Sequence, residues 1–322
     1  MGKILEVKNL TKRYGNHLAV DHLNFTVESG KIYGFLGPNG AGKSTTMNIM
    51  TGYLGATEGQ VLIDGHDILK EPEEAKKNIG YLPEIPPLYM EMTVREYLEF
   101  AAELKGIKKD KREPQIEEVI RLAKLRDVEN RLIQNLSKGY KQRVGLAQAV
   151  LGFPEIIILD EPTVGLDPKQ IIEIRELIRK LAKKHTVILS SHILAEVREV
   201  CDYIMIISGG KLVASDTTEN LENMMSGKGQ IEVEAKASRD EMDHIIRRTG
   251  KIKEVKYRTS ASGITTAQII AKGGEDIREE LFLAFSHADV PMLTLNQSKT
   301  TLEEIFLELT QGSGNRMIKE EK

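Results

Sequence analysis

The sequence predicts an α/β fold built on a mostly parallel sheet, with an antiparallel β part, a helical lobe and a small α+β domain towards the C-terminus. Three observations support this prediction. Strand-sized apolar runs alternate with helical patterns, which is typical of a parallel sheet covered on both faces. One long helical stretch interrupts the alternation, and beyond a run of small residues the order of strands and helices changes. The length of 322 residues also favours two domains over one.

The first strands are expected near the N-terminus, since residues 1–30 alternate apolar and polar positions as half-buried strands do. A short apolar stretch, Ile32-Tyr33-Gly34-Phe35-Leu36, then ends in a glycine-rich turn, and Ser44–Met50 has the pattern of a helix. Strand patterns return at Ile156–Leu159 and Val187–Leu189, each flanked by helical segments. These apolar runs are expected to form the mostly parallel sheet.

The helical lobe is expected over about residues 91–152, where the apolar periodicity is helical. This lobe lies inside a first domain that is expected to span residues 1–222. A small-residue stretch, Met225–Gly229, is the expected linker to a second domain over residues 229–310.

The second domain has the pattern strand, helix, two strands, helix, strand, which resembles a ferredoxin-like split βαβ unit. The segments in chain order are Gln230–Ala235, Arg239–Arg248, two strands around Ser260–Gly263, Glu275–Phe285 and Pro291–Leu295. A last helix is expected at Thr301–Leu309, before a polar tail at 311–322.

The charge of the chain is nearly balanced, with 45 Lys and Arg against 48 Asp and Glu, a formal net charge of −3. Nucleic-acid binders usually concentrate positive charge, so we expect no nucleic-acid partner, and we interpret the basic run Lys105–Arg112 as a solvated helix end. The single cysteine, Cys201, permits no disulfide within the chain and fits a reducing cytoplasm. The N-terminus lacks a signal-peptide pattern and the apolar runs are strand-sized, so membrane contact is expected only through a partner.

A glycine-rich loop predicts nucleotide binding. It matches the pattern GxxxxGK[ST] between an apolar strand and a helix, in the order Gly37, Pro38, Asn39, Gly40, Ala41, Gly42, Lys43, Ser44 and Thr45. Glycines let several backbone N–H groups converge on phosphate oxygens, and the following helix presents its positive end to the anion. We expect Lys43 to reach the β- and γ-phosphates and Ser44 to bind Mg²⁺.

Two carboxylates follow the apolar strand Ile156–Leu159. Asp160 lies at the carboxyl end of that strand, where α/β sheets bind ligands, and can hold Mg²⁺ directly or through water. Glu161 can then accept a proton from an attacking water molecule. Together with the glycine-rich loop, this pair predicts hydrolysis of a nucleoside triphosphate.

With these motifs, residues 1–220 resemble the ATP-binding subunit of an ABC transporter, a P-loop NTPase. Leu136-Ser137-Lys138-Gly139-Tyr140-Lys141-Gln142-Arg143 resembles the family's signature motif, usually LSGGQ, and Gly165-Leu166-Asp167-Pro168 resembles its D-loop. Ser190-Ser191-His192 ends a strand and resembles the switch histidine of the family. Tyr14 stands where the family places an aromatic residue that stacks on adenine.

The resemblance implies a dimer that closes head to tail on ATP and Mg²⁺, with one chain's phosphate loop facing the signature of the other. Ser137 and the amides near Gly139 would bind the γ-phosphate in trans. His192 would contact the same phosphate and help to position the water, and Asp167 would link the two sites. The other six histidines (His17, His22, His66, His185, His244 and His287) are interpreted as surface or packing residues.

Two motifs depart from the family pattern. Glu84 replaces the Q-loop glutamine, and its carboxylate could face Mg²⁺ or the lytic water. In the signature, Lys138 and Tyr140 stand where Gly and Gln are commonest; Lys138 could add a cation near the γ-phosphate or point to solvent. Both departures resemble the branch that serves drug, antibiotic, polysaccharide and gliding-motility exporters, as does the C-terminal segment. That segment could stabilise the fold or the dimer, regulate it, or contact the partner.

The favoured function is therefore an ATP-hydrolysing subunit at the cytoplasmic face of the cell membrane. It would power an integral-membrane permease, an exporter, together with a second ATP-binding subunit, expected to be another copy of the chain. The helical lobe would provide a groove near Glu84–Met92 for the permease. A soluble ABC ATPase that acts on ribosomes or DNA is the alternative, and a module that binds ATP without hydrolysing it is a third reading.

Overall fold

The computed structural model of the chain describes residues 2–221, 230–260, 263–298, 306–307 and 310. The chain divides into two compact units, one within residues 1–218 and the other within 219–308. The expected linker Met225–Gly229 and the polar tail 311–322 lie outside the described residues, as does most of the expected helix Thr301–Leu309. No described helix is both long enough and apolar enough to cross a bilayer.

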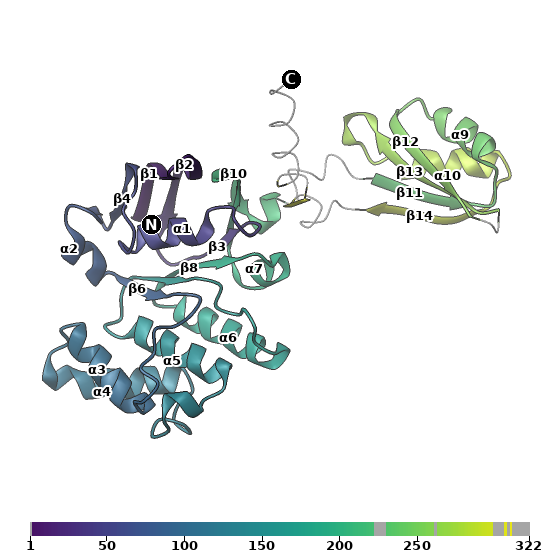
Figure 1. Ribbon diagram of the computed structural model, residues 1–322. Helices are drawn as coiled ribbons and strands as arrows, with labels where there is room; N and C mark the ends of the chain where they lie inside the picture. Colours follow the sequence, from purple (N-terminus) through teal and green to yellow (C-terminus); the bar gives the residue numbers. More distant parts are fainter. Residues whose placement is uncertain (1, 222–229, 261–262, 299–305, 308–309, 311–322) are drawn as a thin grey trace. The chain divides into compact units, whose positions relative to one another are not determined.

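The first unit is built around a six-stranded sheet (Figure 1). Its strands, in spatial order, are β10 (Lys211–Thr217), β9 (Tyr203–Ser208), β3 (Ile32–Leu36), β8 (Thr186–Ser191), β7 (Ile156–Leu159) and β6 (Ile79–Leu82). All neighbours pair in parallel except β10 with β9. The mostly parallel sheet is thus confirmed. Strands β3, β7 and β8 are buried along their whole length, because apolar side chains point to both covered faces.

A second sheet of four strands forms the expected antiparallel part of this unit. Its spatial order is β2 (His17–Glu28), β1 (Lys3–Tyr14), β4 (Glu58–Ile63) and β5 (His66–Asp67). The alternating apolar side chains of β1 and β2 share one core with Phe35 of β3 and with Met47 of helix α1 (Lys43–Met50). Helix α1 therefore packs inside the same core as both sheets.

The remaining helices include the expected helical lobe, drawn below the sheets in Figure 1. The lobe contains α3 (Val94–Leu104), α4 (Lys109–Leu122), the 3₁₀ turn η1 (Ile133–Asn135) and α5 (Lys138–Val150). Helix α3 begins with a capping box, in which Thr93 and Glu96 each bond the other's backbone N–H. Helices α2 (Pro72–Lys77), α6 (Pro168–Leu181) and α7 (Leu194–Val200) complete the unit.

Lys105 is exposed at the end of α3, as expected of a helix end, but its ammonium group also has partners within the lobe. Its Nζ atom donates to the carbonyl oxygens of Gln148, Ala149 and Leu151 at 2.8, 3.1 and 2.7 Å. These are carbonyls at the end of α5, which have no partner within the helix and attract a cation. Desolvation of the ammonium lowers the pKa of Lys105 to about 8. Lys105 thus ties the end of α3 to the end of α5.

The second unit has its own sheet and core. In chain order it contains β11 (Gln230–Ala235), α9 (Arg239–Arg247), β12 (Ile252–Thr259), β13 (Thr265–Ala271), the 3₁₀ turn η2 (Lys272–Gly274), α10 (Arg278–His287) and β14 (Met292–Ser298). The sheet is antiparallel, in the order β12-β13-β11-β14. This βαββαβ order is the one expected from the sequence. Helix α10 begins at Arg278 instead of Glu275, because the turn η2 at 272–274 precedes it.

Candidate functional site

The loop between β3 and α1 makes two close approaches that only glycine permits. A Cβ atom at Gly37 would lie 2.4 Å from the carbonyl oxygen of Ile207, and one at Gly42 would lie 2.5 Å from that of Ala19. Gly42 also has a φ of 101° and is the last residue before α1. The backbone can therefore wrap the N-terminus of α1 tightly, and its free N–H groups can receive an anion.

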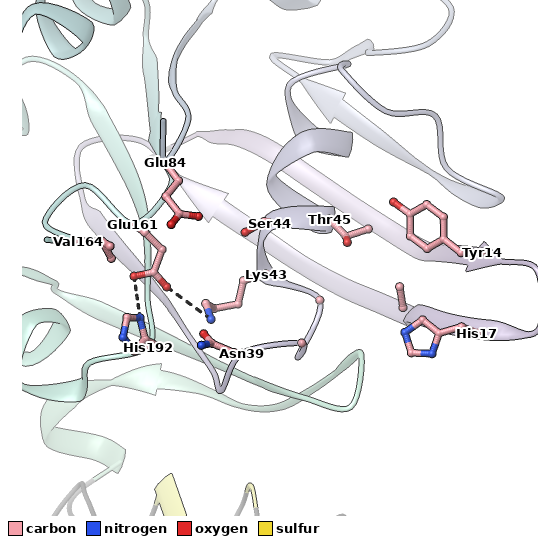
Figure 2. A pocket seen from close by; sticks show the side chains of 13 residues that line it. Tyr14, His17, Asn39, Lys43, Ser44, Thr45, Glu84, Glu161, Val164 and His192 are labelled. Carbon is pink, nitrogen blue, oxygen red and sulfur yellow. Dashed lines mark hydrogen bonds and ion pairs between the residues drawn. The ribbon is translucent and has the colours of Figure 1, made fainter. Parts of the chain in front are cut away.

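Lys43, the first residue of α1, is buried, and its ammonium group lies inside this loop. Its Nζ atom donates to the carbonyl oxygens of Gly37 at 2.8 Å and Pro38 at 3.3 Å. The same atom lies 3.6 Å from Oε1 of Glu161 (Figure 2). These contacts are neutral carbonyls and one carboxylate, so phosphate oxygens can replace them as partners of the ammonium.

The ends of strands β7 and β8 bring two carboxylates and a serine together. Ser190 Oγ donates to Asp160 Oδ1 at 2.5 Å and accepts from the backbone N–H of Glu161 at 2.9 Å. Ser44 Oγ of the loop donates to the same Asp160 oxygen at 3.3 Å. Ser190 is a site residue that the sequence interpretation did not assign. The sequence feature that could have identified Ser190 is a hydroxyl residue at the end of an apolar strand, two residues before His192.

Glu161 is held between a lysine and a histidine. Its Oε1 faces Lys43, and its Oε2 lies 3.0 Å from Nδ1 of His192 (Figure 2). The Glu161 side chain is buried, whereas that of His192 is partly exposed. The backbone of Glu161 has a φ of 46°, a left-handed conformation that costs energy for a non-glycine residue. A buried carboxylate beside a half-exposed imidazole can take and pass on a proton.

These groups line one cavity of about 560 Å³ (Figure 2). The residues that the sequence predicted and that line it are Tyr14, Asn39, Gly40, Gly42, Lys43, Ser44, Thr45, Glu84, Glu161 and His192. Three others also line it, namely His17, Ala19 and Val164. His17 is exposed, as expected of a surface residue, but it pairs with Tyr14 across the turn between β1 and β2. Only this register brings it to the cavity.

Tyr14 ends strand β1 with half of its side-chain surface exposed. One face of its ring is approached by Lys12 Nζ, 5.3 Å from the ring centroid. The ring lies beside Thr45 and His17 in Figure 2, at the opposite end of the cavity from Glu161. An exposed aromatic ring and the loop that holds Lys43 line the same cavity, which suits a ligand with a planar group at one end and phosphates at the other.

Several predicted site residues do not line this cavity. Gly37, Pro38 and Ala41 belong to the loop but are not among the residues that line the cavity, and Asp160 contacts Ser44, which does line it. Ser137, Gly139 and Asp167 lie elsewhere in the unit. Ser137 caps α5 by accepting from Tyr140 N, and Asp167 caps α6 by accepting from Gln170 N. Gly139 packs against Gln170, since a Cβ there would lie 2.6 Å from its Cδ.

The two unusual signature residues have partners within the chain. Tyr140 Oη donates to Asp127 Oδ2 at 2.6 Å, and this bond, followed by desolvation, raises the pKa of the Tyr140 phenol. Lys138 is exposed and extends over Gly165, where a Cβ would lie 2.3 Å from its Nζ. Both side chains thus lie against other residues of their own chain, Tyr140 against Asp127 and Lys138 against Gly165.

The oxygen donors near the loop fit a hard divalent cation. Ser44 Oγ and Asp160 Oδ1 are 3.3 Å apart, and the exposed carboxylate of Glu84 lines the same cavity. Among the described residues, no cluster of three or more His, Cys, Asp or Glu could hold a metal by itself. Mg²⁺ is usually bound by one or two carboxylates together with water and substrate phosphates, and the donor set here is of that kind.

Comparison with known proteins agrees with this geometry. The family model described as ABC transporter matches residues 20–164. The bacitracin transport ATP-binding protein BcrA of Bacillus licheniformis is 43% identical over 224 residues, which cover 69% of this chain and 72% of that protein. The linearmycin resistance ATP-binding protein LnrL of Bacillus subtilis is 31% identical over 308 residues, 95% of this chain and 98% of that protein.

Two solved structures extend the comparison to the fold. One, described as the ATP-binding subunit of an ABC transporter, aligns with a TM-score of 0.63 and 32% identity, over 69% of this chain and 93% of that one. The other is the dimeric post-hydrolysis state of the ATP-binding cassette MJ0796 bound to ADP and Pi. It aligns with a TM-score of 0.60 and 28% identity, over 66% of this chain and 98% of that one. The family model and these relatives agree, and the chain therefore belongs to the ATP-binding subunits of ABC transporters and is an ATPase.

Proposed function

We propose that this ATPase powers an exporter: two copies close head to tail around ATP and Mg²⁺ and drive an integral-membrane permease at the cytoplasmic face of the cell membrane. The relatives named for bacitracin transport and linearmycin resistance support the direction of transport. They do not favour the alternative of a soluble ATPase acting on ribosomes or DNA, and the net charge of −3 offers no general attraction to nucleic acid.

One observation supports the dimer most directly. Lys43, Glu161 and His192 line a single cavity, whereas the signature residues Ser137 and Gly139 do not line it. Ser137 is exposed at the N-terminus of α5, a position from which helix N–H groups can receive phosphate oxygens. A second copy would supply this missing half of the site, and the dimeric state of the MJ0796 cassette supports that arrangement.

The residues of the cavity would divide the work of binding. The backbone amides of the loop and Lys43 would bind the β- and γ-phosphates, and Tyr14 would stack on adenine. Ser44, Asp160 and Glu84 would hold Mg²⁺. When bound, the ion neutralises charge that develops on the phosphates.

The residues at the ends of β7 and β8 would carry the hydrolytic step. Glu161 would accept the proton of the attacking water, and its separation of 3.0 Å from Nδ1 of His192 suits an imidazole that orients this water against the γ-phosphate. Asp167, exposed at the start of α6, would contact the second subunit and link the two sites. Closure would thus follow ATP binding, and hydrolysis would release it.

The permease would meet the helical lobe. A second cavity of about 560 Å³ lies between the segment after β6 and helix α3, and it is lined mainly by apolar side chains, among them Leu88, Tyr89, Tyr97 and Phe100. An amphipathic helix from a cytoplasmic loop of the permease would fit such a groove.

Complementation between two inactive variants tests the head-to-tail dimer. Lys43→Ala removes the phosphate-binding cation, and Ser137→Asp places a carboxylate against the γ-phosphate while it keeps the N-cap acceptor of α5. A mixed dimer regains one intact site, so mixing the purified variants should restore ATPase activity that neither has alone. Ser137→Asn is the matched control, because asparagine also caps the helix but adds no charge.

Two results would contradict the proposal. If Ser137→Asp retains the activity of Ser137→Asn, the signature does not face the γ-phosphate. If mixing restores nothing while both variants remain folded by circular dichroism, each chain completes its site by itself. Association with the permease is tested separately, by co-purification of the chain with the membrane protein encoded beside it.

A further inference from the structure

Helix α7 carries a buried carboxylate that no proposed step of hydrolysis uses. Glu196 is 7% exposed. Its Oε2 atom accepts hydrogen bonds from Thr163 Oγ1 at 2.5 Å and from Ser191 Oγ at 3.2 Å. Within the part of the chain that the structure describes, none of the ion pairs found includes Glu196. Burying a carboxylate without a cation is costly, so these two hydroxyl groups are its main compensation.

Both hydroxyl donors lie next to the catalytic pair in sequence. Thr163 is two residues after Glu161, in the turn that follows β7, and Ser191 immediately precedes His192 at the end of β8. Thr163 and Ser191 are themselves buried. Ser191 Oγ also accepts from the backbone N–H of Ile193 at 3.0 Å, which holds the chain on the far side of His192. Glu196 therefore joins the turn after β7 to the turn after β8.

The two turns carry groups whose separation decides the chemistry. Oε2 of Glu161 lies 3.0 Å from Nδ1 of His192, a contact that depends on how the turns sit against each other. One link between the turns is Ser190 at the end of β8, whose hydroxyl oxygen accepts a hydrogen bond from the backbone N–H of Glu161. The left-handed backbone of Glu161 needs its surroundings to hold it in place. Glu196 supplies a second link between the two turns, through its hydrogen bonds with Thr163 and Ser191.

We propose that Glu196 is a positioning residue for ATP hydrolysis, which holds the Glu161 turn and the His192 turn in their working arrangement through Thr163 and Ser191. This inference rests on the roles proposed above for Glu161 and His192. Glu196 does not line the cavity and would touch neither ATP nor water there. Its removal should therefore slow the chemical step and leave ATP binding by the phosphate loop almost unchanged.

The test compares Glu196→Ala with Glu196→Gln. Alanine leaves both hydroxyl groups without their acceptor, whereas the carbonyl oxygen of glutamine can accept from both. Misplacing catalytic groups by about 1 Å can cost on the order of 100-fold in rate, so we expect kcat to fall about 10- to 100-fold in the alanine variant. Glutamine should restore kcat to within about threefold. Glu199→Gln, an exposed glutamate on the same helix, is the control.

Calorimetric titration with ATP gives both the dissociation constant and the fraction of chains that bind, so kcat can be expressed per competent site. A role in folding alone would lower the binding fraction while kcat per competent site stays at the wild-type value, and that result would overturn the proposal. An equal loss of kcat in the alanine and glutamine variants would overturn it too. If Glu196→Ala does not fold, Thr163→Val and Ser191→Ala each remove one donor and should each lower kcat per site.

Glu161→Gln, measured in parallel, separates this inference from the function proposed above. If Glu161→Gln keeps near-normal turnover, the proposed base is wrong, and the argument for Glu196 loses its foundation. If Glu161→Gln is inactive while Glu196→Ala turns over ATP at the wild-type rate, the base stands and only the inference about Glu196 fails.

Discussion

Nδ1 of His192 lies 3.0 Å from Oε2 of Glu161, although 31 positions separate the two residues in the chain. They meet because β7 and β8 are parallel neighbours, with Leu159 opposite Leu189 in the pairing register. Each strand ends at the same edge of the sheet, and each delivers its polar residue just beyond that edge. The contact is therefore a consequence of strand register.

Replacing His192 by alanine should impair turnover more than binding. The imidazole hydrogen-bonds Glu161, whereas Lys43 is held by the loop carbonyls of Gly37 and Pro38, so we expect the phosphate site to remain. General acid–base groups contribute about 10²–10⁴-fold to rate, and we expect kcat to fall by about 10²-fold or more in steady-state ATPase assays. His22→Ala, an exposed histidine outside the cavity, should leave kcat unchanged. A fall in ATP affinity that accounts for the whole loss would contradict this prediction.

Replacing Lys43 by alanine should weaken ATP binding. A charge-assisted hydrogen bond contributes about 1.5–3 kcal/mol, and Lys43 would make more than one to the phosphates. We expect the dissociation constant to rise by about 100-fold or more in calorimetric titration, at equal Mg²⁺. Lys184→Ala, on an exposed surface, serves as the control. Binding that is unchanged by Lys43→Ala would exclude the loop as the phosphate site.

Gly80→Ala should destabilise the first unit. A Cβ at Gly80 in β6 would lie 2.2 Å from the carbonyl oxygen of Ala149 near the end of α5, and 3.0 Å from Pro154 Cγ. Backbone cannot swing aside as a side chain can, and overpacking of this kind costs about 1–3 kcal/mol, sometimes more. Thermal unfolding measures the loss. Gly55→Ala is the control, because its added methyl group meets no atom within 4 Å, and its stability should stay within about 0.5 kcal/mol.

The helical lobe should lose an electrostatic contribution in acid. Hydrogen bonds from Arg126 and Arg95 lower the pKa of Glu117 from 4.5 to about 2 in the folded chain. Between these values the unfolded chain binds more protons than the folded one, so the contribution is complete above pH 4.5 and is lost as the pH falls towards 2. In urea unfolding, the difference in stability between wild type and Glu117→Gln should shrink over this range. Glu99→Gln, at an exposed position of α3, should not reproduce this change.

The parts of the site that the sequence predicted are those whose chemistry is local. The loop from Gly37 to Thr45 lies between a strand and a helix that its own neighbours in sequence form. Asp160 and Glu161 follow four consecutive apolar residues, a pattern that favours a buried strand, and these residues form β7. In both cases the physical requirement, a tight backbone turn or a carboxylate after a strand, is met within about ten consecutive residues.

Two features that the sequence interpretation did not include depend on contacts made in the folded chain. Lys105 is exposed, as predicted, but the carbonyls that its ammonium group binds belong to residues more than forty positions away. His17 lines the cavity because the turn between β1 and β2 pairs it with Tyr14, three residues earlier. The sequence interpretation assigned neither contact.

By itself, the sequence determined the fold class, the phosphate loop and the two carboxylates after β7, because periodicity and turn chemistry act over a few residues. Tertiary structure alone decided which of these groups touch. The register of parallel strands placed Ser190 between Asp160 and Glu161, and set His192 against Glu161. It also buried Glu196 under both turns. Except for the contact of Ser191 with Glu196, these contacts join residues about thirty positions apart, and a one-dimensional pattern carries no information on strand order or register.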